Sequence, residues 1–324
     1  MTAKTRYFVA GSLVVLGVGI SAGLVAYFMA SPGLAGRLAV ENELELVPED
    51  TTLLAYADVR EVMLSELRER LRLFLPFEAD GRNEFLEETG INIETDVDRV
   101  LFALAPAPVD AQPPVAALVI ARGRFDESKI QSLMLARGAQ VQEHRSHRLI
   151  VAGDAPDSGI AVSFIETGLA AVGSAHLVRA AIDRADGGPN VRNNAQVMEL
   201  VRGLDAGNVW AVGRIDTLLA RANLPGNVLQ NLPAVSWFSV NAHVNGGIRG
   251  AVRLETLDEA SATQLRDLVR GLVALAKLHG PSSPEVQSLL NSLQPGGTGT
   301  TVALAFDVPS TVFDSLPSPP ANRQ

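Results

Sequence analysis

The chain contains no cysteine among its 324 residues, and aromatic residues make up only 5% of it. Without thiols there are no disulfide bonds, no thiolate catalysis, no cysteine-ligated metals and no lipid attached to a cysteine. With so few aromatic side chains, the core must be built mainly from leucine, valine, isoleucine and alanine. Lysine is also scarce, with three residues against 24 arginines. Arginine favours fixed bidentate pairing, although a GC-rich genome gives the same bias.

The charge of the chain is negative overall and unevenly distributed. The formal net charge is −9, and because residues 1–36 hold two basic and no acidic residues, the remainder carries −11. An acidic surface of this kind disfavours nucleic acid and anionic lipid as partners.

One long apolar run stands near the start, where residues 8–30 contain no charged side chain. A helix of that length, at about 1.5 Å per residue, crosses a hydrocarbon core of roughly 30 Å. A cleaved signal peptide is the alternative, but its apolar region is shorter and Pro32 does not suit cleavage there. Lys4 and Arg6 precede the run, so the positive-inside rule keeps the N-terminus in the cytoplasm. The sequence therefore predicts a single-pass anchor in the inner (cytoplasmic) membrane, with the bulk of the chain in the periplasm.

Within this anchor, Gly19 and Gly23 form a G-x-x-x-G pattern. Two glycines one helical turn apart leave a groove into which a neighbouring membrane helix packs closely. We therefore expect Gly19 and Gly23 to be helix-packing residues in the membrane.

Composition and turn signals divide the chain into five segments. They are a cytoplasmic stub with the anchor (1–30), a tether (31–47), a first α+β module with an extra β-meander (48–205), a second α+β module (206–310) and a proline-rich tail (311–324).

The two modules show the same order of predicted elements. Residues 51–58 alternate as a strand, a helix is predicted over 59–75, strands over 97–105 and 114–122, and a helix from 126 to about 136. The second half repeats this with strands near 208–215, 234–244 and 247–255, a helix over 259–278 and a last strand at 300–308. The order strand–helix–strand–strand–helix–strand is that of the split βαβ unit. The predicted fold class is thus α+β, a transmembrane helix followed by duplicated ferredoxin-like antiparallel sheets with helices on one face.

No pattern in the chain indicates a catalytic, cofactor-binding or metal-binding site. His144 and His147 form an H-x-x-H, but on one strand that spacing places the rings on opposite faces. The glycine-rich residues 296–300 follow a helix and lead into a strand without a lysine, unlike a phosphate loop. No G-x-S-x-G nucleophile elbow occurs. We therefore predict a protein that is not an enzyme and needs no cofactor or metal.

One face of the helix predicted over 59–75 is basic. Arg60, Arg68, Arg70 and Arg72 lie on it and are a candidate face for an acidic partner. The alternative is that these arginines pair with Glu61, Glu66 and Glu69 on the surface of the same helix.

Two segments carry a resemblance to a known group of proteins. VPEDTTLLAYADV at 47–59 and GLAAVGS at 168–174, together with one N-terminal span, resemble bacterial membrane-anchored envelope proteins grouped as domains of unknown function. The resemblance covers most of the extramembrane part, and its motifs are structural, so it implies no catalytic residues.

These observations favour a non-enzymatic scaffold or accessory subunit. It would pack on the periplasmic face of a larger integral membrane complex of respiratory or photosynthetic type, with the anchor helix beside that complex. The alternative is a periplasmic carrier or sensor of an apolar ligand such as a lipid, held between sheet and helices. An enzyme of an unrecognised type is a third possibility.

Overall fold

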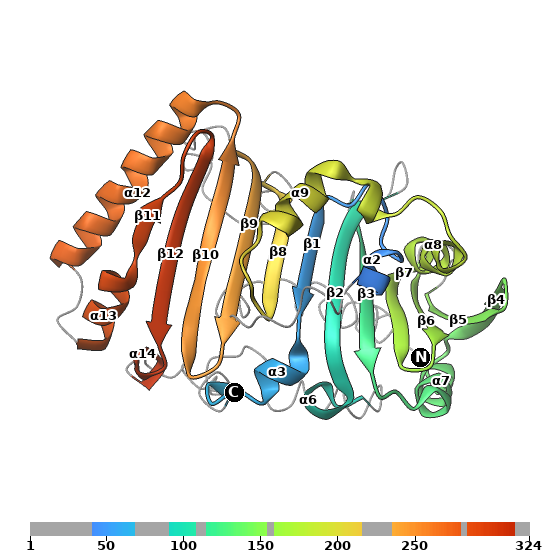
Figure 1. Cartoon of the computed structure of the whole chain (residues 1–324). Coiled ribbons are helices and arrows are strands. Elements are labelled where there is room, and N and C mark those ends of the chain that lie inside the picture. Colours follow the sequence, from blue (N-terminus) through green and yellow to red (C-terminus); the bar gives the residue numbers. More distant parts are fainter. Residues whose placement is uncertain are drawn as a thin grey trace.

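A computed structural model describes residues 41–68, 91–107, 115–153, 159–215, 235–279 and 284–314. Its strands form one 12-stranded antiparallel sheet with the order β11-β12-β10-β9-β8-β1-β2-β3-β7-β6-β5-β4 (Figure 1). The sheet extends across the whole molecule, with α12 and α13 at one end and the β4–β5 hairpin at the other (Figure 1).

The strands are β1 (Leu53–Ala57), β2 (Val97–Pro106), β3 (Val115–Gly123), β4 (Gln140–His144), β5 (His147–Ala152), β6 (Ile160–Glu166), β7 (Leu169–Ser174), β8 (Val209–Arg214), β9 (Val235–Val244), β10 (Gly247–Thr256), β11 (Gln294–Gly296) and β12 (Thr301–Pro309). The helices are α2 (Glu41–Leu44), α3 (Val59–Met63), α6 (Ile93–Asp96), α7 (Glu127–Ala136), α8 (Ala175–Ala185), α9 (Ala195–Gly203), α12 (Glu259–His279), α13 (Pro284–Ser292) and α14 (Thr311–Asp314), with a 3₁₀ turn η2 at Val191–Asn193.

The prediction of two separate ferredoxin-like sheets is wrong, because β1 and β8 join both halves into one sheet. These strands pair antiparallel from Leu53↔Gly213 to Ala57↔Val209. At this junction Tyr56 faces Trp210, so the central hydrogen bonds of the sheet link segments about 150 residues apart in sequence. The division into segments 48–205 and 206–310 stays a prediction about the chain and does not describe separate sheets.

The order of the strands also differs from that of a split βαβ unit. In that unit β1 and β2 would run parallel and be separated by another strand, whereas here they are antiparallel neighbours, with Ala57 opposite Val100. The strand β2 begins at the end where β1 finishes, and β3 and β7 follow as antiparallel neighbours.

Helices cover both faces of the sheet, which corrects the prediction of helices on one face. Leu54 and Tyr56 of β1 belong to a core cluster with Val178 and Ile182 of α8. Leu53 points the other way, into a cluster that includes Phe238 and borders Leu254. On that opposite side Leu254 packs against the cluster formed by Ala262 and Leu265 of α12 with Val302 of β12. Because alternate side chains of a strand point to opposite faces, α8 and α12 lie on opposite sides of the sheet.

The composition of the central strands explains why both faces need cover. Five of the six residues of β8 (VWAVGR) are buried, and four of the five residues of β1 (LLAYA). A strand with apolar residues on both sides is stable only between two layers. A sheet with helices on one face alone needs strands with one apolar and one polar face, and β1 and β8 are not of that kind.

Two predicted segments take a different form. Of the helix predicted over 59–75, the structure describes α3, which ends at Met63; the Ser65 hydroxyl then donates to the Val62 carbonyl, and Leu67 enters the core. Residues 69–75 lie outside the described ranges. The last part of the predicted tether contains α2; Leu44 at the end of this helix and Leu46 and Val47 after it are buried. Among the residues that the structure describes, no helix has the length and apolarity that a membrane crossing requires. The predicted anchor at 8–30 lies outside the described ranges.

Candidate functional site

The helix α12 begins at a well-formed cap. The Asp258 carboxylate accepts hydrogen bonds from the Ser261 backbone N–H (2.7 Å) and the Ser261 hydroxyl (3.1 Å). These bonds lower the pKa of Asp258, and Glu259 adds a second negative charge to the first turn. Both negative charges interact favourably with the positive end of the helix dipole. They therefore stabilise the start of the helix at this position.

The first half of α12 is held to the sheet by its apolar face. Ala262 and Leu265 are buried against Val302 of β12, and Val269 one turn later lies partly buried beside them. This face fixes how the helix lies along the end of the sheet (Figure 1).

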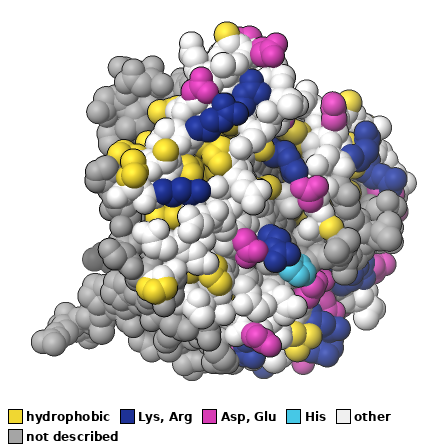
Figure 2. Space-filling view, turned by 60° about the vertical axis from the view of Figure 1, so that its left-hand side comes forward, with side chains coloured by type: hydrophobic (Ala, Val, Ile, Leu, Met, Phe, Trp, Pro, Cys, Tyr) yellow, Lys and Arg dark blue, Asp and Glu magenta, His cyan; other side chains and the backbone are white. Residues whose placement is uncertain are grey.

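A second row of leucines on α12 remains exposed. Leu268, Leu272, Leu275 and Leu278 are between 48% and 79% exposed, and we refer to these four residues as the leucine stripe. Their spacing of four, three and three residues places them along one side of the helix. Figure 2, which brings this end of the molecule forward, shows hydrophobic side chains at the surface among Lys and Arg residues. A row of exposed leucines on one helix is a candidate site of interaction.

Two arginines of α12 are engaged within the chain. Arg270 pairs with Asp267 at 3.2 Å, and Arg266 donates to the Gly297 carbonyl at 3.1 Å. The leucine stripe itself contains no charged side chain.

The candidate arginine face is only partly within the described ranges. Arg60 pairs with Asp98, and Arg68 pairs with Glu94. Both arginines thus have an acidic partner inside the chain, on residues other than the glutamates considered from the sequence. Arg70 and Arg72, like Gly19 and Gly23 of the anchor, lie outside the described residues.

A buried carboxylate that sequence reasoning missed lies on α2. Glu43 is 2% exposed, and its Oε1 accepts from Arg99 (2.8 and 3.0 Å) and from Arg122 (2.8 Å). Arg122 also donates to Glu166 of β6 at 2.8 Å. The cluster ties α2 to β2, β3 and β6 by charge-assisted hydrogen bonds. The signal in the sequence was the group of apolar residues Leu44, Leu46 and Val47 directly after Glu43, which indicates that this segment packs against the protein.

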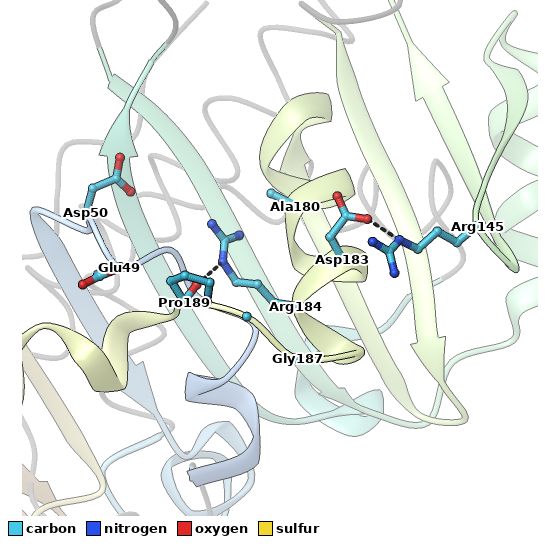
Figure 3. A pocket seen from close by; sticks show the side chains of 9 residues that line it. Glu49, Asp50, Arg145, Ala180, Asp183, Arg184, Gly187 and Pro189 are labelled. Atoms are coloured by element: carbon cyan, nitrogen blue, oxygen red, sulfur yellow. Dashed lines mark hydrogen bonds and ion pairs between the residues drawn. The ribbon is translucent and has the colours of Figure 1, made fainter.

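A pocket of ≈ 570 Å³ lies beside α8 (Figure 3). Its lining residues come from the loop before β1, the β4–β5 turn, α8 and the loop after α8: Glu49, Asp50, Arg145, Ala180, Asp183, Arg184, Gly187, Gly188 and Pro189.

Ion pairs and burial shape this pocket. Arg145 takes the unusual φ of +51° in the hairpin turn and pairs with Asp183 (2.6 Å) and Asp186 (2.8 Å). Arg184 donates to the Pro189 carbonyl at 3.0 Å, and burial lowers the pKa of its guanidinium. A wall of this kind suits water or a small charged molecule and does not suit an apolar one.

The two histidines of the H-x-x-H pattern lie on neighbouring strands. His144 ends β4 and His147 begins β5, and they are directly opposite each other in the hairpin. Each ring nevertheless has its own partner, Asp183 Oδ1 for His144 (2.9 Å) and the Ile165 carbonyl for His147 (3.1 Å). Within the described ranges, no three His, Asp or Glu side chains are grouped in a way that suits a metal ion.

Comparison with protein families and with curated proteins finds no match. Among solved structures, the chain is similar to the one titled "Structure of crystal form I of TP0453", with 10% identity and a TM-score of 0.49. That match covers 84% of this chain and 96% of the other. A similarity this distant supports no argument about fold or function, so the proposals below rest on the residues of this chain.

Proposed function

We propose that this protein is a non-enzymatic, membrane-anchored scaffold or accessory subunit at the periplasmic face of a larger integral membrane complex. The apolar segment at 8–30 would hold it in the inner membrane. The observation that carries the proposal is the leucine stripe, through which α12 would bind another protein.

The energetics of the leucine stripe support a protein contact. Burying a leucine side chain completely stabilises a protein by roughly 1.5–3 kcal/mol relative to leaving it exposed. The four leucines are each about half exposed or more. The isolated chain therefore lacks much of the stabilisation that their burial would give. A partner that covers them recovers part of this free energy, and the uncharged stripe has no charge to desolvate in return.

The alternative of a carrier for an apolar ligand lacks a supporting observation in the described part of the chain. The pocket beside α8 is lined by two arginines and three acidic residues. The clusters on both faces of the sheet are filled by packed side chains from strands and helices.

Mild detergent extraction of the full-length chain tests the proposal. We expect a stoichiometric integral membrane protein to co-purify, and Leu272→Ser/Leu275→Ser to reduce its recovery. Leu135→Ser is the matched control, since Leu135 is an exposed leucine of α7, outside the leucine stripe. Recovery that is equal for both variants, or extraction of lipid without any stoichiometric protein, would overturn the proposal.

A further inference from the structure

The pocket beside α8 contains a positive charge whose donors are mostly unused. Arg184 donates through Nε to the Pro189 carbonyl, which fixes how its guanidinium lies. Its Nη1 is buried and has no hydrogen-bond partner among the described residues. A guanidinium carries five N–H donors and stays charged, so burying one of its nitrogens without an acceptor is unfavourable. The pocket therefore presents a fixed cation to an acceptor that the described chain does not supply.

A carboxylate without a cationic partner borders the same cavity. In Figure 3 the Arg184 guanidinium lies between the carboxylates of Asp50, in the loop before β1, and Asp183 of α8. Asp183 pairs with Arg145 at 2.6 Å, whereas Asp50 makes no ion pair within the described ranges. Burial lowers the pKa of Arg184, and the charge of Asp50 partly opposes this effect, so the two groups interact across the gap without contact. One cation and one anion thus stand apart at the edge of the pocket.

The backbone on both sides of this gap is held in place. Gly187 and Gly188 have φ of +107° and +139°, which glycine adopts readily, and the turn that they form leads to the Pro189 carbonyl. Across the pocket, Asn194 donates to the Glu49 carbonyl at 2.8 Å and fixes the loop before β1. A site that is formed in advance binds a ligand without the cost of ordering its own loops.

The charges of the wall decide which class of ligand fits. A ligand with only negative groups meets three carboxylates, those of Glu49, Asp50 and Asp183, and is repelled. A ligand with only positive groups leaves the guanidinium of Arg184 without an acceptor. The nine lining residues include neither an aromatic ring nor a large apolar side chain on which a nucleobase or a lipid would pack. A small molecule that carries both charges matches the wall.

We propose that this pocket binds a small zwitterion of the α-amino acid type, with its carboxylate on Arg184 and its ammonium group on Asp50. Both contacts are charge-assisted hydrogen bonds, which are stronger than neutral ones. The volume of ≈ 570 Å³ lies within the range of roughly 300–1,000 Å³ for small-molecule sites and leaves room for a side chain. The proposal does not depend on the leucine stripe, because α12 lies at the other end of the sheet from the β4–β5 turn that borders the pocket (Figure 1).

Saturation-transfer NMR of the full-length chain in detergent, with L-alanine and L-lysine as probes, tests the proposal. We expect a dissociation constant on the order of 1 mM, because few groups hold the ligand. Propionate lacks the ammonium group of alanine and ethylamine lacks its carboxylate, so each should bind at least roughly tenfold more weakly. Equal binding of propionate or ethylamine would overturn the proposal, as would the absence of binding by both amino acids at about 20 mM.

Two single substitutions locate the ligand. Arg184→Gln removes the cation and Asp50→Asn removes the free carboxylate, and we expect each to weaken L-alanine binding at least roughly tenfold. Arg192→Gln is the matched control, since Arg192 is half exposed, pairs with Glu45 and does not line the pocket. Circular dichroism checks that each variant is folded, and Asp50, as an exposed residue, provides a test that does not disturb α8. Equal affinities in all three variants would place the ligand elsewhere and contradict the proposed site.

Discussion

The ring of Tyr56 in β1 stacks on the ring of Trp210 in β8, with centroids 5.7 Å apart and an interplanar angle of 26°. The two residues are directly opposite in the register that joins the halves of the sheet. Both are buried, at 2% and 4% exposure, so the stack lies at the centre of the core on the α8 side.

Truncating this stack should destabilise the whole sheet. Trp210→Ala leaves a cavity between the two halves, and we expect a loss of about 3–5 kcal/mol in the free energy of unfolding. Urea unfolding followed by fluorescence of Trp237 measures it, because that residue is the other tryptophan.

Tyr56→Phe is the matched conservative variant. The Tyr56 hydroxyl is buried and has no hydrogen-bond partner among the described residues, and burial raises the pKa of this phenol. Removing an unpartnered hydroxyl leaves the stack in place, so we expect stability to be unchanged or slightly higher. A loss as large as that of Trp210→Ala would show that the hydroxyl has a partner.

The buried carboxylate of Glu43 should contribute more to the stability of the fold than the exposed acidic residues near it. Glu43→Gln removes the negative charge that Arg99 and Arg122 share, and we expect a loss of about 2 kcal/mol or more because the two guanidinium charges are left without the carboxylate that compensates them. Glu45→Gln is the control, since Glu45 is half exposed and pairs with Arg192 at the surface. Equal urea midpoints for the two variants would contradict a structural role for the cluster.

Lowering the pH should reduce the stability of the fold, because His243 is held neutral in the folded protein. Burial, with a smaller contribution from Arg249 on the next strand, lowers the pKa of His243 to about 4 in the folded protein. The unfolded chain binds this proton near pH 6.5, so stability falls as the pH decreases from about 6.5 to 4. Urea midpoints across this range should decline less steeply for His243→Gln than for the wild type. Parallel curves would show that His243 titrates normally.

Much of the local structure could be predicted from the sequence because it depends on near neighbours. The strand predicted over 97–105 is β2, the strand over 114–122 is β3, and the helix over 259–278 is α12. Asp58 and Asp126 accept the N-terminal hydrogen bonds of α3 and α7, as their positions before apolar helical patterns indicate. Asn245 and Gly246 connect β9 and β10 as a hairpin.

The tertiary structure alone decided how these elements combine. Whether β1 pairs with β8 is set by long-range contacts such as the stack of Tyr56 on Trp210, and no local pattern encodes that choice of partner. The same holds for Glu43, whose burial depends on Arg99 and Arg122, more than 50 residues away. The leucine stripe was present in the sequence as a helical pattern. Only the placement of α12 against Val302 decided which of its leucines the chain covers and which it leaves exposed.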